Sequence, residues 1–145
     1  MKVKVGIDCG VKTGFAIAMN GILTRVETLT ITKAMDAIKE LHSQYPEMIV
    51  RIEDARKRTW FGSVDARQAR SGAGVREGVG SVKRDCSIWE QFCIEQDIKF
   101  DLVHPAANLT KTKEAYFKKM TGWTGRTSEH SRDAAMLVHQ YKSVL

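Results

Sequence analysis

Apolar residues recur at two spacings along this chain, and the spacing changes near residue 31. Before that point they alternate with polar residues or form short runs rich in β-branched side chains, the pattern of strands. Turn residues at 9–14 and the hairpin signal Asn20-Gly21 divide this part of the chain. We therefore predict an antiparallel meander, with strands over 2–8, 15–19 and 22–30.

Beyond residue 31, apolar residues fall three or four apart, which predicts a helix over 33–44 capped by Thr32. The later pattern predicts, in chain order, a covered strand at 48–53, a helix at 79–96, a strand at 98–104, a helix at 113–120 and a helix at 129–141 capped by Ser128. Three strands followed by alternating helices and strands predict a single α/β domain over residues 1–145. Its sheet would be mixed and five-stranded, flanked by helices.

Composition narrows the class of protein. The 145 residues include 23 Lys and Arg against 17 Asp and Glu, a net charge of +6 that favours polyanionic partners such as nucleic acid. The N-terminal segment lacks the apolar stretch of a signal peptide and no later segment could span a bilayer, so we expect a cytoplasmic protein without a membrane partner. Cys9, Cys86 and Cys93 form no Cys-x-x-Cys pair, so neither a disulfide framework nor a zinc knuckle is expected.

Basic residues are concentrated after the fourth predicted strand. Residues 51–84 hold nine Lys and Arg against four Asp and Glu. We interpret this stretch as a basic, glycine-rich surface loop leading into the long helix, placed where a DNA backbone would pass. Trp60 and Phe61 would either stack on a splayed base or belong to the core, and the sequence leaves both open. The candidates for DNA contact are Arg56, Lys57, Arg58 and Lys83.

Three carboxylates fall where elements of this sheet begin or end. Asp8 ends the first strand and Glu53 the fourth, each on the face opposite the more apolar side chains, so parallel neighbouring strands would bring them together. Asp133 lies three residues after His130 at the positive end of the last helix. Cations that hydrolyse phosphodiesters need several oxygen ligands from different elements. We predict that Asp8, Glu53 and Asp133 bind metal; Asp54, of opposite parity, ranks second.

An imidazole beside such a site can bind metal or take a proton from water. His130 is therefore predicted as a further ligand or as the activator of the attacking water. Taken singly, each of these residues also fits an ordinary solvated strand end or first helical turn. Their order along the chain is what favours a site.

Three motifs together resemble the RuvC family of Holliday junction resolvases, over nearly the whole chain. They are Gly-Ile-Asp-Cys-Gly-Val-Lys-Thr-Gly-Phe-Ala from residue 6, Arg-Ile-Glu-Asp from residue 51 and His-Ser-Arg-Asp-Ala-Ala from residue 130. The resemblance implies an RNase H-like fold, with three antiparallel strands and then two parallel ones. It also implies catalytic roles for the matching residues Asp8, Glu53, His130 and Asp133.

By the same resemblance the protein would be a homodimer that cuts opposed strands of a four-way junction with Mg²⁺, for which Mn²⁺ substitutes. Lys111 and Lys113 look similar to family residues that contact the DNA backbone. Bacterial members carry an aromatic residue three positions after the strand-four glutamate, but here that position is Arg56. The resemblance therefore implies no particular opening of the junction or cleavage sequence. In length the chain looks like compact phage-encoded members, which act on several branched forms.

Three other functions fit parts of the pattern. A catalytically silent junction-binding protein of the same fold would account for the basic charge. An actin-like ATPase would account for residues 8–14, although 145 residues hardly accommodate its two domains. An RNA:DNA hybrid nuclease shares the fold, but the late His-x-x-Asp pair and the long helix favour a resolvase. We therefore predict a structure-specific endodeoxyribonuclease acting on Holliday junctions and other branched DNA by two-metal hydrolysis.

Overall fold

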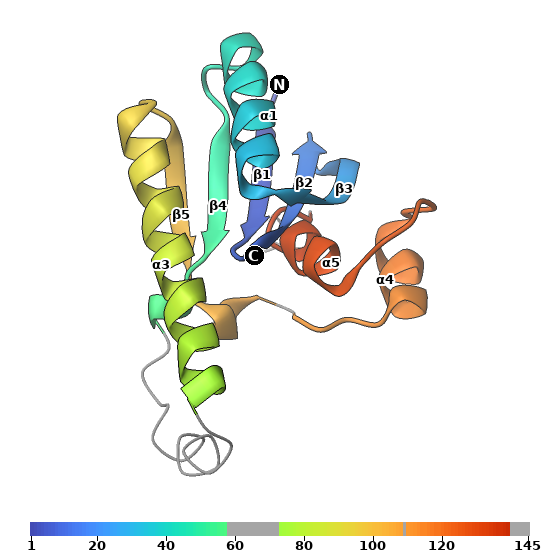
Figure 1. The fold of residues 1–145 in the computed structure, drawn as a ribbon. Coiled ribbons are helices and arrows are strands. Elements are labelled where there is room, and N and C mark those ends of the chain that lie inside the picture. The colour runs from blue at the N-terminus through green and yellow to red at the C-terminus, as the bar shows by residue number, and fades with distance from the viewer. Residues whose placement is uncertain (58–72, 109, 140–145) are drawn as a thin grey trace.

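A computed structural model describes residues 1–57, 73–108 and 110–139, and the backbone alone for 73–79. Its centre is a mixed five-stranded sheet of order β3-β2-β1-β4-β5 (Figure 1), which confirms the sheet predicted from the pattern. The first three strands pair antiparallel, whereas β1 pairs parallel with β4 and β4 with β5. The strands are β1 (Val3–Asp8), β2 (Lys12–Met19), β3 (Ile22–Thr30), β4 (Ile49–Glu53) and β5 (Lys99–Val103).

Helices follow β3, β4 and β5 along the chain and pack on the sheet. Figure 1 shows α3 running beside β4 and β5, in line with the contacts between these elements. The helices are α1 (Ile31–Gln44), α3 (Ala73–Glu95), α4 (Glu114–Thr121) and α5 (Glu129–Met136), with 3₁₀-helices η1 (Ala55–Lys57) and η2 (Pro105–Ala107) after β4 and β5. None of these described helices combines the length and apolar character needed to cross a membrane.

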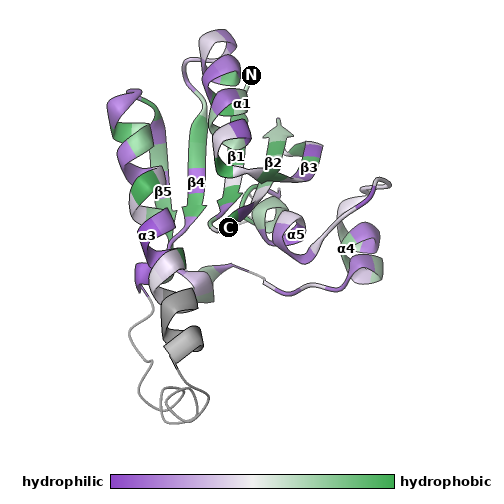
Figure 2. Cartoon of the chain, in the orientation of Figure 1, coloured by the Kyte–Doolittle hydropathy of each residue, from purple (hydrophilic) through white to green (hydrophobic). Residues whose placement is uncertain are grey.

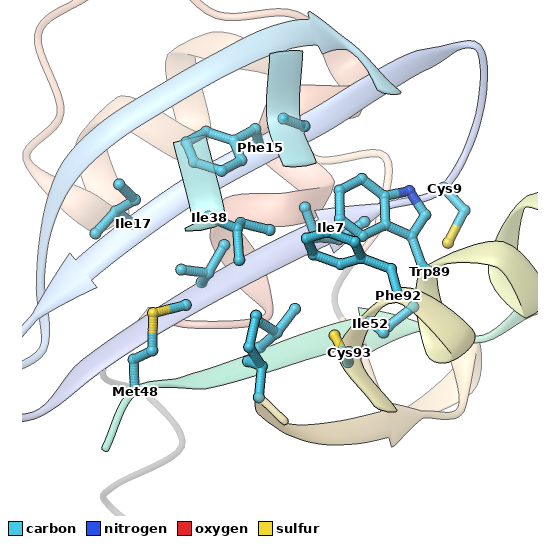
Figure 3. Close-up of a cluster of buried hydrophobic side chains, with 14 of the residues drawn as sticks. Ile7, Cys9, Phe15, Ile17, Ile38, Met48, Ile52, Trp89, Phe92 and Cys93 are labelled. Atoms are coloured by element: carbon cyan, nitrogen blue, oxygen red, sulfur yellow. The ribbon is translucent and has the colours of Figure 1, made fainter. Parts of the chain in front are cut away.

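Two hydrophobic clusters lie on the sheet. In the first, shown in Figure 3, the sheet residues Ile7 and Phe15 pack with Ile38 of α1 and Trp89 of α3. The second joins α5 and α4 to β2 and β3, with Phe117 fully buried. Figure 2 shows the hydropathy of these elements: β1 and β4 are mostly hydrophobic, whereas hydrophobic and hydrophilic residues alternate along α1 and α4. All three cysteines are buried free thiols.

Element boundaries differ from the prediction where local geometry decides them. Thr32 does not cap α1; Thr30 does, because its backbone is extended and its side chain accepts a hydrogen bond from the Lys33 amide. The long helix begins at residue 73 rather than 79, and β2 begins at Lys12. The last helix ends at Met136; residues 137 and 138 form a turn, and residues 140 and 141 of the predicted helix lie outside the described residues.

Candidate active site

Asp8 and Glu53 end two neighbouring parallel strands. The register of β1 and β4 pairs Asp8 with Glu53, so the two carboxylates leave the sheet on the same face. Glu53 is 8% exposed and the Asp8 side chain 16%, which places both carboxylates largely out of water. Successive side chains of a strand point to opposite faces of the sheet. Ile7 and Ile52, which precede the two carboxylates, are fully buried on the opposite face.

Two glycines let α5 lie directly on the sheet at this point. A Cβ atom on Gly6 would collide with the carbonyl oxygen of Ala134, and one on Gly14 would collide with the carbonyl oxygen of His130. The added Cβ of Gly14 would also lie 2.9 Å from the Cβ of Asp8. Any larger residue would therefore hold the helix away from β1 and β2. The close approach brings the first turns of α5 to the end of β1.

His130 and Asp133 reach the site from α5. Ser128 caps this helix as predicted, in a reciprocal capping box with Ser131. The cap sets where the helix begins, so His130 lies in its first turn, with Nδ1 2.9 Å from Oδ2 of Asp8. Asp133 lies one turn further and is 8% exposed. The structure thus places the four residues that sequence reasoning assigned to the site at the same end of the sheet.

The segment between β5 and α4 also contacts these carboxylates, which sequence reasoning did not foresee. The backbone amide of Lys111 donates to Oδ1 of Asp133 at 2.7 Å, and Lys111 has a left-handed backbone, with φ of 56°. The side-chain amide of Asn108 donates to Oε2 of Glu53 at 3.0 Å. Asn108 is 7% exposed. An asparagine in a loop carries no periodicity, so nothing in the spacing singled it out.

Burial changes the protonation of the site. It raises the pKa of Asp8 to about 6, and the charge of Asp133 adds to the effect although the hydrogen bond from His130 opposes it. Burial also raises the pKa of Asp133, with the charge of Glu129 contributing and the Lys111 amide opposing. Burial disfavours the ionised form of both carboxyl groups and the charge of Asp133 adds to this at Asp8, so a bound cation would favour their ionised forms.

The donor set fits a hard divalent cation. Asp8, Glu53 and Asp133 offer carboxylate oxygens, the ligand type that Mg²⁺ and Mn²⁺ prefer. The buried amide oxygen of Asn108 has no hydrogen-bond partner among the described residues, which suits a site completed by a cation or its water. In the described residues, however, no three His, Cys, Asp or Glu side chains are grouped closely enough to hold a metal ion. A cation would therefore have to draw these side chains together.

The predicted DNA-contacting residues fall into two groups. Arg56 is occupied within the protein: its Nε lies 2.7 Å from Oδ1 of Asp54 and its Nη2 2.8 Å from Oε1 of Glu90. Burial opposes ionisation of Asp54, but hydrogen bonds from Arg56 outweigh it and hold the pKa of Asp54 below its ordinary value. Lys57 donates to the carbonyl oxygen of Leu102 at 2.8 Å.

The second group lies on α3 and on the segment before α4. Lys83 lies partly exposed on α3, and Lys111 and Lys113 are exposed on the segment that leads into α4. Both of these last lysines therefore stand on the segment that contacts Asp133 and Glu53. Arg58, Trp60 and Phe61 lie outside the described residues.

No protein-family model and no curated protein matches the sequence. Among solved structures, RuvC of T. thermophilus in complex with a Holliday junction substrate is similar, with a TM-score of 0.59, 13% identity and coverage of 95% of this chain and 90% of that one. A second structure of Thermus thermophilus RuvC gives a TM-score of 0.49 at 16% identity, with coverage of 94% and 90%. Similarity at this identity establishes the fold alone. The chain therefore has the RuvC-like, RNase H-like fold that its motifs predicted.

Proposed function

We propose that this protein is a divalent-metal-dependent endonuclease that cuts branched DNA, with the four-way junction as its principal substrate. The observation that supports this most is the convergence of Asp8, Glu53 and Asp133 from β1, β4 and α5 at one end of the sheet. RuvC, whose fold it shares, has been captured with a Holliday junction. A net charge of +6 suits a nucleic acid substrate.

In this proposal Asp8, Glu53 and Asp133 hold the cations, Mg²⁺ or Mn²⁺. Bound there, such cations would acidify the attacking water and stabilise the leaving oxygen of the cleaved phosphodiester. The residues of the chain supply the rest. Asp8 orients His130 through Nδ1, and the other ring nitrogen, Nε2, then accepts the proton of the attacking water.

Basic residues position the substrate in the same proposal. Lys111 and Lys113 neutralise backbone phosphates beside the carboxylates, and Lys57 and Lys83 extend the contact. Arg58, outside the described residues, is proposed as a further phosphate contact. Arg56 supports this surface through its ion pairs with Asp54 and Glu90. Two copies of the chain would present two such sites to opposed strands of one junction, so the proposal includes a homodimer.

The experiment that tests the function is cleavage of an end-labelled synthetic four-way junction, beside linear duplex and an RNA:DNA hybrid, with Mg²⁺, Mn²⁺ or chelator. We expect paired nicks confined to the junction, formed with either cation and suppressed by the chelator. Cutting of the hybrid in preference to the junction would assign the protein to another nuclease class. Tight junction binding with no cutting under any condition would establish a silent binding protein instead.

A further inference from the structure

Asn108 links two elements of the proposed site through one side chain. It follows η2, and its Nδ2 lies 3.0 Å from Oε2 of Glu53 at the end of β4 and 3.1 Å from the carbonyl oxygen of Asp133 in α5. A carbonyl oxygen can only accept, so the atom that faces it is the amide nitrogen, and the orientation of the side chain is determined. Both hydrogen atoms of that nitrogen therefore have acceptors in the site.

The amide oxygen of Asn108 is buried without a hydrogen-bond partner in the part of the chain that the structure describes. Buried acceptors are rarely left unpaired in native proteins, and such an atom points to a partner supplied by water or a cation. Amide oxygens are ordinary ligands of hard divalent cations. Here the unpaired oxygen belongs to a side chain already bonded to a carboxylate that is proposed to bind metal.

The neighbouring backbone holds the same part of α5. Three residues beyond Asn108, the amide of Lys111 donates to Oδ1 of Asp133, with Lys111 in a left-handed conformation that a lysine rarely adopts. Asp133 is thus contacted at its backbone oxygen by Asn108 and at its carboxylate by Lys111. Strained backbone of this kind persists where surrounding contacts determine it.

We infer that Asn108 is a positioning residue of the cation site: its amide nitrogen fixes the Glu53 carboxylate relative to Asp133, and its amide oxygen serves the hydrated cation. This inference rests on the proposed function, because it needs a cation at these carboxylates. Residues that orient metal ligands typically change metal affinity by about 10–100-fold when they are removed.

The test compares wild type with Asn108→Ala, Asn108→Asp and the control Asn20→Asp, which alters the other asparagine of the chain in the exposed β2–β3 turn. For each protein, Mn²⁺ affinity is measured by electron paramagnetic resonance. The melting temperature is measured once with Mn²⁺ and once with chelator, and junction affinity is measured in chelator. Asn108→Ala should weaken Mn²⁺ binding about 10–100-fold with little change in junction affinity. The control should bind Mn²⁺ as wild type does.

Asn108→Asp keeps an oxygen but loses the donor and adds a carboxylate beside Glu53. In chelator its melting temperature should be lower than that of wild type. Mn²⁺ should raise its melting temperature by more than it raises that of wild type, whereas the rise for Asn108→Ala should be smaller than for wild type. A structural role alone would lower both melting curves equally. If Asn108→Ala folds and binds Mn²⁺ as wild type does, or if Asn108→Asp gains no more than wild type, the inference is overturned while the proposed function stands. Absence of Mn²⁺ binding by wild type would overturn both.

Discussion

Nδ1 of His130 lies 2.9 Å from Oδ2 of Asp8, which joins the first turn of α5 to the end of β1 across 122 positions of sequence. An ionised carboxylate only accepts hydrogen bonds, so beside ionised Asp8 the proton of the imidazole stays on Nδ1. The lone pair is then on Nε2. This tautomer is the one a general base requires, and it makes the role of His130 testable.

Replacing His130 by Gln should lower the single-turnover cleavage rate of a four-way junction by about 100-fold or more, the usual contribution of a general base. Junction affinity in chelator should stay near that of wild type, because half of the His130 side chain is exposed and little packing is lost. His42→Gln on α1 is the matched control and should cleave normally. Equal rates for the two variants would remove His130 from the mechanism.

Asp8→Asn and Asp133→Asn should each reduce cleavage by about 1,000-fold or more, since loss of a cation ligand removes several kcal/mol of transition-state stabilisation. Binding of the intact junction should persist. Asp36→Asn, an exposed substitution of the same kind on α1, should leave the rate unchanged. Retained cleavage in both site variants would show that the carboxylates were assigned wrongly.

The raised pKa of Asp8 predicts how the metal-free protein responds to pH. Between the ordinary pKa of 3.8 and about 6 the unfolded chain has lost the proton that the folded chain retains. The free energy of unfolding should therefore fall as pH rises through this range, by about 3 kcal/mol from this group, and level off above it.

Denaturant unfolding in chelator from pH 4 to 8 measures this effect. The quantity compared is the difference in the free energy of unfolding between wild type and Asp8→Asn. The difference is needed because burial lowers the pKa of His139, and this group changes the free energy of unfolding with pH in the opposite direction. Asp8→Asn should be the more stable protein at pH 8 and should lose this advantage towards pH 4. If the difference in the free energy of unfolding does not vary with pH, the pKa of Asp8 is not raised in the folded protein.

Gly14→Ala tests the close packing of α5 on the sheet. The added methyl group must displace the backbone of His130, so we expect a loss of about 1–3 kcal/mol in the free energy of unfolding and a lower cleavage rate. Gly80→Ala is the control: this position is exposed on α3 with nothing near its Cβ, and alanine there should stabilise the helix by up to about 1 kcal/mol. A neutral Gly14→Ala would mean that α5 sits further from β2.

Arg56→Ala separates a structural role from direct DNA contact. Asp54 is only 2% exposed, and removal of its guanidinium partner should cost about 3 kcal/mol of stability without any DNA present. Lys113→Ala should instead leave stability unchanged, weaken junction binding and reduce its salt dependence by about one counterion. If Arg56→Ala is as stable as wild type, Arg56 has no structural role and is again a candidate for DNA contact.

The sequence by itself determined the elements of this protein and the identity of its candidate ligands. Alternation over 3–7, the Asn20-Gly21 turn and the helical spacing after residue 31 are local patterns, and each acts through neighbours a few residues away. Asp8 and Glu53 could be singled out because they stand where two such patterns end. The cap at Ser128 was visible for the same reason.

Only the tertiary structure decided which of these residues meet. The parallel register that sets Asp8 opposite Glu53 joins positions 45 apart, and a shift of one residue would turn one carboxylate to the other face. The bridge from Asn108 to Glu53 and the capture of Arg56 by Asp54 and Glu90 likewise depend on how β4, α3 and the segment after β5 pack. Such contacts follow from the filling of a shared core, which no local spacing encodes.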